Sequence, residues 1–154
     1  MPDDGNIEAI YYTSLFRHEV DEKRRVQIPA KWRPAQPDAE FTLILWPNGS
    51  IPDSHLMVLP PQEMKSLVEK IRLMPVSDPR ASALRRLLGS KSASVTPDKS
   101  GRVCLPEEMA KLVGIDKKAL LVGLMDRFEI WNPERYETVS AVDAALTSEA
   151  FKLI

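Results

Sequence analysis

Two stretches of the chain combine charged side chains in the same order. "DEKRRVQIP" begins at Asp21 and reaches Arg25 four residues later, and "DKSGRVCLP" begins at Asp98 and reaches Arg102 at the same spacing. An aspartate at the start of a turn accepts hydrogen bonds from backbone N–H groups or from a nearby arginine. Planar guanidinium groups suit phosphate oxygens and the O6 and N7 atoms of guanine. Each stretch therefore predicts a rigid loop directed at a polyanion.

The side chains of these loops are expected to have different tasks. Arg25 and Arg102, where the following strand begins, are candidates for contacts with base edges or phosphates. Further cations in the loops suit phosphate contacts, which give affinity without reading sequence: Lys23, Arg24 and Lys99. Asp21 and Asp98 are expected to orient the loops. Alternatively, such Asp–Arg pairs merely close surface turns and are worth about 0–1 kcal/mol each, but the repetition in register favours nucleic-acid binding.

The rest of the chain repeats along with these loops. The offset of 77 residues that superposes them also aligns "LILW" at 43–46 with "LLVG" at 120–123. A smaller offset of 72 residues aligns "HLMVLP" at 55–60 with "RFEIWN" at 127–132, so the first copy has five extra residues around "PNGSIPD". Two matching blocks in chain order indicate an internal duplication.

Each half is predicted to contain the same elements in the same order. A strand such as "YYTSLFRHEV" leads into the charged loop, and a short strand follows with Val26 and Ile28 on one face. A proline then opens a short helix, which is well formed in "PEEMAKLVG" but is cut short in the first half by Pro34 and Pro37. Two apolar strands and a longer helix complete each half.

Three longer helices are predicted around these strands. The first covers 61–74 and the second begins at Pro133; their apolar stripes are Met64, Leu67, Val68, Ile71 and Met74, and Tyr136, Val139, Val142 and Leu146. The third, in "SDPRASALRRLLG", joins the halves, with Ser77 as its N-cap and Gly89 as its end. Its arginines form either a solvated face or the rim of a subunit interface: Arg80, Arg85 and Arg86.

A half of some 60 to 70 residues is too small to bury its apolar strands alone. We therefore expect an α+β fold in which both halves interleave into one β-barrel with pseudo-twofold symmetry and flanking helices. The predicted segments are a loose N-terminal tail (1–10), a first half (11–74), the inter-repeat helix (75–90), a second half (91–146) and a C-terminal tail (147–154). Trp32, Trp46 and Trp131 are expected in the core or at interfaces, and Arg33 in a structural role with its stem over apolar surface.

The charge distribution is uneven although the formal net charge is only −1. Residues 17–33 carry six cations against three acids, and residues 80–102 carry six cations against one acid. Exposed charges more than about 8 Å apart are largely screened at physiological salt. Local sign therefore matters more than the sum, and a nucleic-acid partner is compatible with this composition.

The sequence argues against several other classes of protein. It contains no apolar run of the roughly 20 residues that span a bilayer. The single Cys104 fits a reducing cytoplasm and a packing role in a strand, and His18 and His55 with one cysteine give no metal-ligand spacing. We find no glycine-rich phosphate loop, no nucleophile with a nearby histidine and no suitable carboxylate pair. We therefore expect no enzyme activity, no metal, no cofactor and no small-molecule substrate.

The duplicated Asp-x-x-x-Arg motif, followed by an alternating strand and proline, resembles the MraZ family. The similar stretches are "LFRHEVDEKRRVQIPAKWR", "LLGSKSASVTPDKSGRVCLPEEMAKLVGI" and "LLVGLMDRFEIWNPERYE", together with the inter-repeat segment "RRLLGS", which overlaps the start of the second stretch. The resemblance implies two AbrB-like swapped-hairpin halves and a bacterial transcription regulator of the operon for cell division and cell-wall synthesis. It also implies a cytoplasmic, nucleoid-associated, ring-shaped homo-oligomer that binds short direct repeats in promoter DNA.

One position departs from the pattern of that family. The family loop reads Asp-x-Lys-Gly-Arg; the second loop keeps this glycine as Gly101, but the first has Arg24 in its place. A non-glycine residue at positive φ costs on the order of 1 kcal/mol. We therefore expect either a first loop of different shape or an additional DNA contact by Arg24 that offsets the strain.

A different binding module is the alternative to a DNA-binding regulator. An AbrB-like antitoxin embraces a toxin through a flexible tail, and such proteins usually have one half-barrel per chain. This chain has two halves and a C-terminus, "VSAVDAALTSEAFKLI", with a helical pattern.

Overall fold

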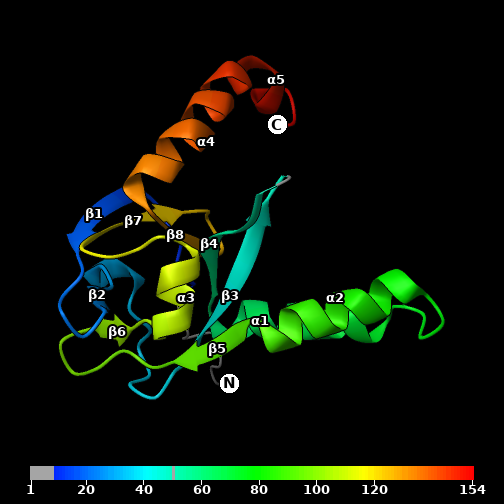
Figure 1. Cartoon of the computed structure of the whole chain (residues 1–154), viewed down its shortest axis with the longest axis horizontal. Coiled ribbons are helices and arrows are strands. Elements are labelled where there is room, and N and C mark those ends of the chain that lie inside the picture. The colour runs from blue at the N-terminus through cyan, green and yellow to red at the C-terminus, as the bar shows by residue number, and fades with distance from the viewer. Residues whose placement is uncertain (1–8, 50) are drawn as a thin grey trace, which may run out of the picture.

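The computed structural model of the chain describes residues 9–49 and 51–154. Within them the fold is α+β, with a central antiparallel sheet from which helices extend in two directions (Figure 1). In chain order the elements are β1 (Leu15–Glu19), β2 (Arg25–Gln27), the 3-10 turn η2 (Ala30–Trp32), β3 (Phe41–Asn48), β4 (Ile51–Leu59), α1 (Pro61–Arg72), α2 (Pro79–Ser90), β5 (Ser92–Val95), β6 (Arg102–Cys104), α3 (Glu107–Leu112), β7 (Lys118–Gly123), β8 (Phe128–Trp131), α4 (Pro133–Ala145) and α5 (Thr147–Phe151).

The two halves of the chain interleave in the strand pairing. Six strands form one sheet in the order β1-β7-β8-β4-β3-β5, and β2 and β6 form a separate two-stranded ribbon. If each strand is exchanged for its counterpart in the other half (β1 for β5, β2 for β6, β3 for β7, β4 for β8), the sheet order reads the same backwards. The strand order is therefore symmetric under exchange of the two halves. The described pairings leave β1 and β5 as edges, however, so the closed barrel that we expected is not confirmed.

The β2–β6 ribbon is anchored to the main core by its inward-facing side chains. Val26, Ile28, Val103 and Leu105 are at most 1% exposed and belong to the same apolar cluster as Trp32. Burial of such a side chain contributes roughly 1.5–3 kcal/mol. The ribbon is therefore a fixed platform for the loops that precede its strands.

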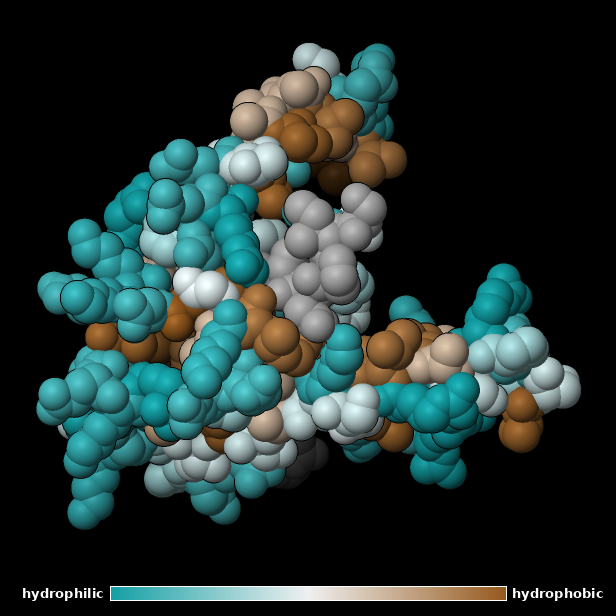
Figure 2. Space-filling model, in the orientation of Figure 1, coloured by the Kyte–Doolittle hydropathy of each residue, from teal (hydrophilic) through white to brown (hydrophobic). Residues whose placement is uncertain are grey.

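The helices α1 and α4 occupy equivalent places in the two halves. Each begins directly after the last strand of its half with a proline in its first turn, and Asn132 caps α4 by accepting from the backbone N–H of Glu134 at 2.8 Å. The first turns pack on the sheet, through Met64 and Leu67 in α1 and through Tyr136 and Val139 in α4. The later turns project beyond it, and exposed apolar side chains gather on the C-terminal helices (Figure 2).

The ends of several elements differ from the sequence prediction. The lead-in strand is shorter than "YYTSLFRHEV", because Ser14 has φ 85° and Tyr12 forms only an isolated bridge with Met125. The N-cap of α2 is Asp78, not Ser77, since its carboxylate accepts from the backbone N–H of Arg80 at 2.9 Å, and α2 continues past Gly89 to Ser90.

The structure also tests the predictions for the two tails and for the short first-half helix. Residues 1–8 of the expected N-terminal tail lie outside the described residues, and Ile10 packs against the core. Part of the expected C-terminal tail forms α5. The first-half helix is only the turn η2, as Pro34 and Pro37 predicted. No helix among the described residues has both the length and the hydropathy needed to cross a membrane.

Candidate nucleic-acid interface

The first charged loop is a closed turn organised by Asp21. Its Oδ1 accepts from the backbone N–H groups of Lys23 at 2.9 Å and Arg25 at 2.8 Å, and its Oδ2 accepts from Arg25 Nε at 2.6 Å. Two backbone bonds close the turn, from Arg24 N to Asp21 O at 2.9 Å and from Asp21 N to Arg25 O at 3.2 Å. The aspartate thus fixes both the backbone of the turn and the direction of the arginine.

The second loop repeats this set of bonds around Asp98. Its Oδ1 accepts from the backbone N–H groups of Ser100 and Arg102, both at 2.9 Å, and its Oδ2 accepts from Arg102 Nε at 3.2 Å. The closing bonds run from Gly101 N to Asp98 O at 2.9 Å and from Asp98 N to Arg102 O at 2.8 Å. Asp98 therefore makes the same set of hydrogen bonds in its turn as Asp21 makes in the first.

These contacts favour the charged form of both carboxylates. The backbone N–H of Arg25, followed by its side chain, lowers the pKa of Asp21 below the ordinary value of an aspartate. The backbone N–H of Arg102 does the same for the pKa of Asp98, with help from the N–H of Ser100. Each carboxylate stays ionised at neutral pH and holds its arginine through a charge-assisted hydrogen bond.

The strand register brings the two turns to one face. In the ribbon Arg25 lies opposite Cys104, Val26 opposite Val103 and Gln27 opposite Arg102. Because Val26 and Val103 point into the core, the four alternate side chains share the outer face. Arg25 and Arg102 are diagonal neighbours on that face, a distance that long side chains bridge.

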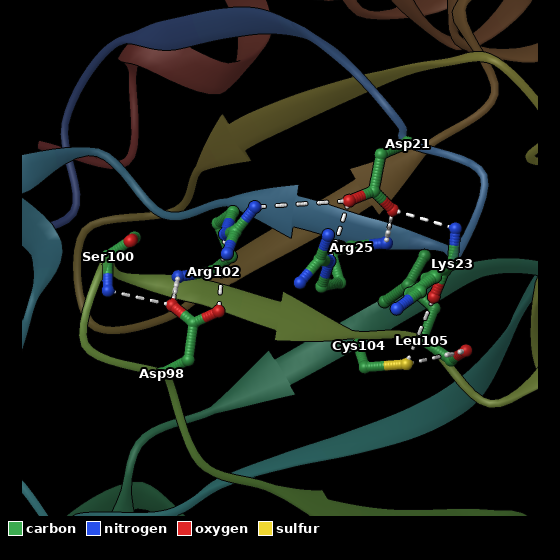
Figure 3. A network of polar contacts seen from close by, with 8 residues as sticks. All are labelled: Asp21, Lys23, Arg25, Asp98, Ser100, Arg102, Cys104 and Leu105. Atoms are coloured by element: carbon green, nitrogen blue, oxygen red, sulfur yellow. Dashed lines mark hydrogen bonds and ion pairs between the residues drawn. The ribbon is translucent and has the colours of Figure 1, made fainter.

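The two arginine side chains lie beside one another between the two aspartates (Figure 3). Arg102 Nη1 is 4.0 Å from Asp21 Oδ2, so the first aspartate approaches the guanidinium of the second turn as well as its own. Both arginine side chains are one-third exposed. Within the described part of the chain, the Nη groups of Arg25 donate no hydrogen bond, which leaves this end of the guanidinium for a ligand.

Two strand side chains complete the symmetry of the ribbon. Gln27 Nε2 donates to the carbonyl of Ser100 at 2.7 Å, and Cys104 Sγ donates to the carbonyl of Lys23 at 3.2 Å. Residues 27 and 104 are counterparts at the offset of 77, as are residues 23 and 100. Cys104 is exposed, so its predicted packing role was wrong; its thiol donates a hydrogen bond to the opposite turn instead. Sequence reasoning missed Gln27, although the repeat offset pairs it with Cys104.

The two turns have the same shape despite the arginine in the first. Arg24 has φ 60° and Gly101 has φ 82°, both in the left-handed region. Of the two alternatives expected from the sequence, a first turn of different shape is therefore wrong, and an additional DNA contact by Arg24 stays a prediction. Arg24 Nε donates to the carbonyl of Leu105 at 3.0 Å, an interaction that offsets the local strain of an L-residue at positive φ.

Other predicted residues lie away from this face or serve the core. Arg80 pairs with Asp78 and Arg85 Nη2 donates to the carbonyl of Ile71 at 3.1 Å, both around α2. Trp32 and Trp131 are buried, as expected. His55 is buried on β4, stacked on Trp131 with its Nε2 3.0 Å from Glu129 Oε2. No cluster of three or more potential metal ligands is found in residues 9–49 and 51–154.

Comparisons with known proteins show which family the chain belongs to. A family model described as "MraZ protein, putative antitoxin-like" matches residues 90–152. A protein of Thermomicrobium roseum named "Transcriptional regulator MraZ" is 32% identical over 135 residues, which cover 87% of this chain and 90% of that protein. The chain belongs to the MraZ family. A MraZ of Desulfitobacterium hafniense with the same name is 33% identical over 90% of this chain and 94% of its own length. A third, from Natranaerobius thermophilus, is 34% identical over 79% and 81%.

The relatives of Thermomicrobium roseum and Desulfitobacterium hafniense match 87% and 90% of the chain, while the family model matches residues 90–152, which contain the second turn. In this chain the second turn has a glycine at its positive-φ position, and the first turn reaches the same region with Arg24.

Proposed function

We propose that the chain is a sequence-specific DNA-binding transcriptional regulator of the MraZ type. The observation that carries this proposal is the pair of equivalent Asp–Arg turns whose arginines lie beside one another on an exposed face of one ribbon. The names of the MraZ relatives, each a transcriptional regulator, support it. A two-stranded ribbon of this kind has the size to enter the major groove of B-form DNA.

The proposed roles follow from the bonds of each side chain. Arg25 and Arg102 contact base edges or phosphates through their Nη groups, since Nε of each is held by its aspartate. Asp21 and Asp98 orient the arginines, and Gly101 supplies the positive φ of the second turn. The exposed Lys23 and Lys99, together with the Nη groups of Arg24, contact phosphates and add affinity that depends on salt.

Two such turns in one chain give little specific affinity, so self-association is part of the proposal. Repetition of the turns around a ring-shaped homo-oligomer, against direct repeats in a promoter, raises affinity through effective concentration. The exposed apolar side chains at the ends of the helices support an interface between copies: Leu73, Val76 and Leu87 on the α1–α2 hairpin, and Val142, Leu146, Phe151, Leu153 and Ile154 at the C-terminus.

The biological setting of the proposal comes from the family resemblance. In the proposal the two halves, with the boundaries given above, have an AbrB-like arrangement. The partner is promoter DNA of the division and cell-wall operon, and the protein is nucleoid-associated in the cytoplasm. No enzyme activity, cofactor, membrane or small-molecule substrate enters it. The alternative, an AbrB-like antitoxin or other protein-binding module, has one observation in its favour, the word "antitoxin-like" in the description of the matching family.

Footprinting on the DNA upstream of the chain's own gene tests the proposal. Protection of two or more short direct repeats is the expected result. A footprint without any repeated element, or no protection at protein concentrations that saturate non-specific DNA, would contradict it. A stoichiometric complex with the product of a neighbouring gene, combined with no footprint, would favour the antitoxin alternative.

A further inference from the structure

Each end of the ribbon carries a guanidinium on an equivalent carbonyl. Arg24 Nε donates to the carbonyl of Leu105 at 3.0 Å, and Arg33 Nε donates to the carbonyl of Ile28 at 3.0 Å. Ile28 and Leu105 are counterparts at the offset of 77. The two arginines are not counterparts, because Arg24 aligns with Gly101 and Arg33 aligns with Ala110.

Both carbonyls lie where one turn joins the opposite strand. The backbone N–H of Leu105 donates to the carbonyl of Arg24 at 2.8 Å, and the backbone N–H of Ile28 donates to the carbonyl of Gly101 at 2.8 Å. Residues 28 and 105 thus donate to the opposite turn and accept from an arginine. Each guanidinium therefore adds a side-chain hydrogen bond at the residue whose backbone N–H already binds the opposite turn.

Gly101 and Arg33 fit together in space. A Cβ at Gly101 would overlap Arg33 Nε and Cζ and would lie 2.9 Å from Arg33 Cδ. The guanidinium of Arg33 therefore occupies the space beside the second turn that a side chain at position 101 would need. In the first turn the residue at that position carries the guanidinium itself.

We propose that Arg24 and Arg33 are positioning residues that fasten the first and the second turn, respectively, by placing a guanidinium on equivalent carbonyls from different positions in the chain. The inference rests on the proposed function for its effect on DNA recognition, but the fastening itself is a property of the free protein. Under this proposal Arg24 holds the first turn in place in addition to any phosphate contact. Gly101 then lacks a side chain for two reasons, its positive φ and the space that Arg33 occupies.

Hydrogen exchange of the full chain without DNA tests the fastening, read by mass spectrometry on peptides covering each turn. Arg24→Lys keeps the charge but lacks the planar Nε donor, and it should raise exchange in residues 21–25 about tenfold while residues 98–102 keep their rate. Arg33→Lys should do the reverse. Arg80→Lys, an exposed control on α2, should change neither segment. Unchanged exchange in both lysine variants, or equal changes in both segments, would overturn the proposal.

A second measurement separates positioning from charge. Promoter binding by both lysine variants should lose its preference over scrambled duplex while the dependence on salt stays the same, because the number of cations is unchanged. Full preference with unaltered exchange would make Arg24 a simple phosphate contact and overturn the proposal. If exchange responds as expected but the unmodified protein does not prefer promoter DNA, the fastening holds and the proposed function fails.

The space shared by Gly101 and Arg33 gives a further check. Gly101→Ala should lower the thermal midpoint more in the unmodified background than in Arg33→Ala, where only the strain of positive φ remains. Equal losses in the two backgrounds would contradict the contact between the two residues.

Discussion

Asp21 contacts the arginines of both turns. Its Oδ2 accepts from Arg25 Nε at 2.6 Å and lies 4.0 Å from Arg102 Nη1. Of these two arginines, the side chain of Asp98 contacts only Arg102. An ion pair at 4.0 Å between groups that are one-third exposed is worth about 0–1 kcal/mol. The pseudo-symmetric turns are therefore not equal: Asp21 approaches both arginines, and we expect it to contribute more than Asp98 to the orientation of the pair.

Asp21→Asn is expected to reduce specific DNA binding more than Asp98→Asn. An amide has lost the charge that holds both arginines, so promoter affinity should fall about tenfold for Asp21→Asn and less for Asp98→Asn. Both changes add the same net positive charge, which makes them matched controls for non-specific attraction. Fluorescence anisotropy with promoter and scrambled duplexes measures the ratio of the two affinities for each variant. A larger loss for Asp98→Asn would contradict the central role of Asp21.

The lowered pKa values predict how the turns respond to acid. Because folding lowers the pKa of Asp21 and Asp98, their stabilising contribution is fully present above the ordinary aspartate pKa of about 3.9 and is lost as pH falls through the lower folded values. The turns should therefore stay closed from pH 7 to pH 5. Carboxyl titration by NMR should give both residues midpoints below those of exposed aspartates. Ordinary midpoints would show that the hydrogen bonds are not maintained in solution.

Much of the fold follows from local patterns in the sequence. The repeat offsets of 77 and 72 residues predict which strands and helices are counterparts, and β3, β7, α1 and α4 lie where the offsets place them. Prolines predicted the short first-half helix. The pairing of β1 with β7 and of β3 with β5 joins distant segments, and whether such a sheet closes depends on twist and stagger that no local pattern encodes.

Loss of the side chains under the ribbon is expected to destabilise the whole domain. Ile28→Ala and Leu105→Ala each remove a fully buried side chain at equivalent positions. Each should lower the free energy of unfolding by about 2–5 kcal/mol. Lys117→Ala, at an exposed position before β7 and outside the proposed interface, is the control and should change it by no more than about 0.5 kcal/mol. Urea unfolding at fixed protein concentration compares them; a change near zero for Leu105→Ala would mean that the ribbon is not part of the core.

The exposed apolar residues of the C-terminal helices predict an interface between copies. Phe151→Glu should shift the protein towards smaller species, because it places a charge in the exposed apolar cluster formed with Leu153 and Ile154. Ser148→Glu adds the same charge to α5 outside this cluster and should leave the assembly unchanged. Sedimentation velocity measures the size distribution. The same distribution for Phe151→Glu and the unmodified protein would exclude this helix end from the interface.

The candidate site was only partly predictable. The spacing of Asp21, Arg25, Asp98 and Arg102 gave the residues of the turns, since an aspartate and an arginine four residues apart form a local unit. The contributions of Gln27 and Arg33 could not be read in the same way. Their hydrogen bonds, to Ser100 and Ile28, depend on how the two strands align and on where the turn η2 ends.

The most direct test of the proposed site is binding of promoter duplex by Arg25→Ala, Arg102→Ala and the double variant at several salt concentrations. Each single change should weaken specific binding by about 1–3 kcal/mol, and the double variant should lose its preference for promoter over scrambled duplex. Arg80→Ala removes the same charge from α2 and should keep that preference. A double variant that folds normally and still prefers the promoter as strongly as the unmodified protein would contradict the assignment of these two arginines.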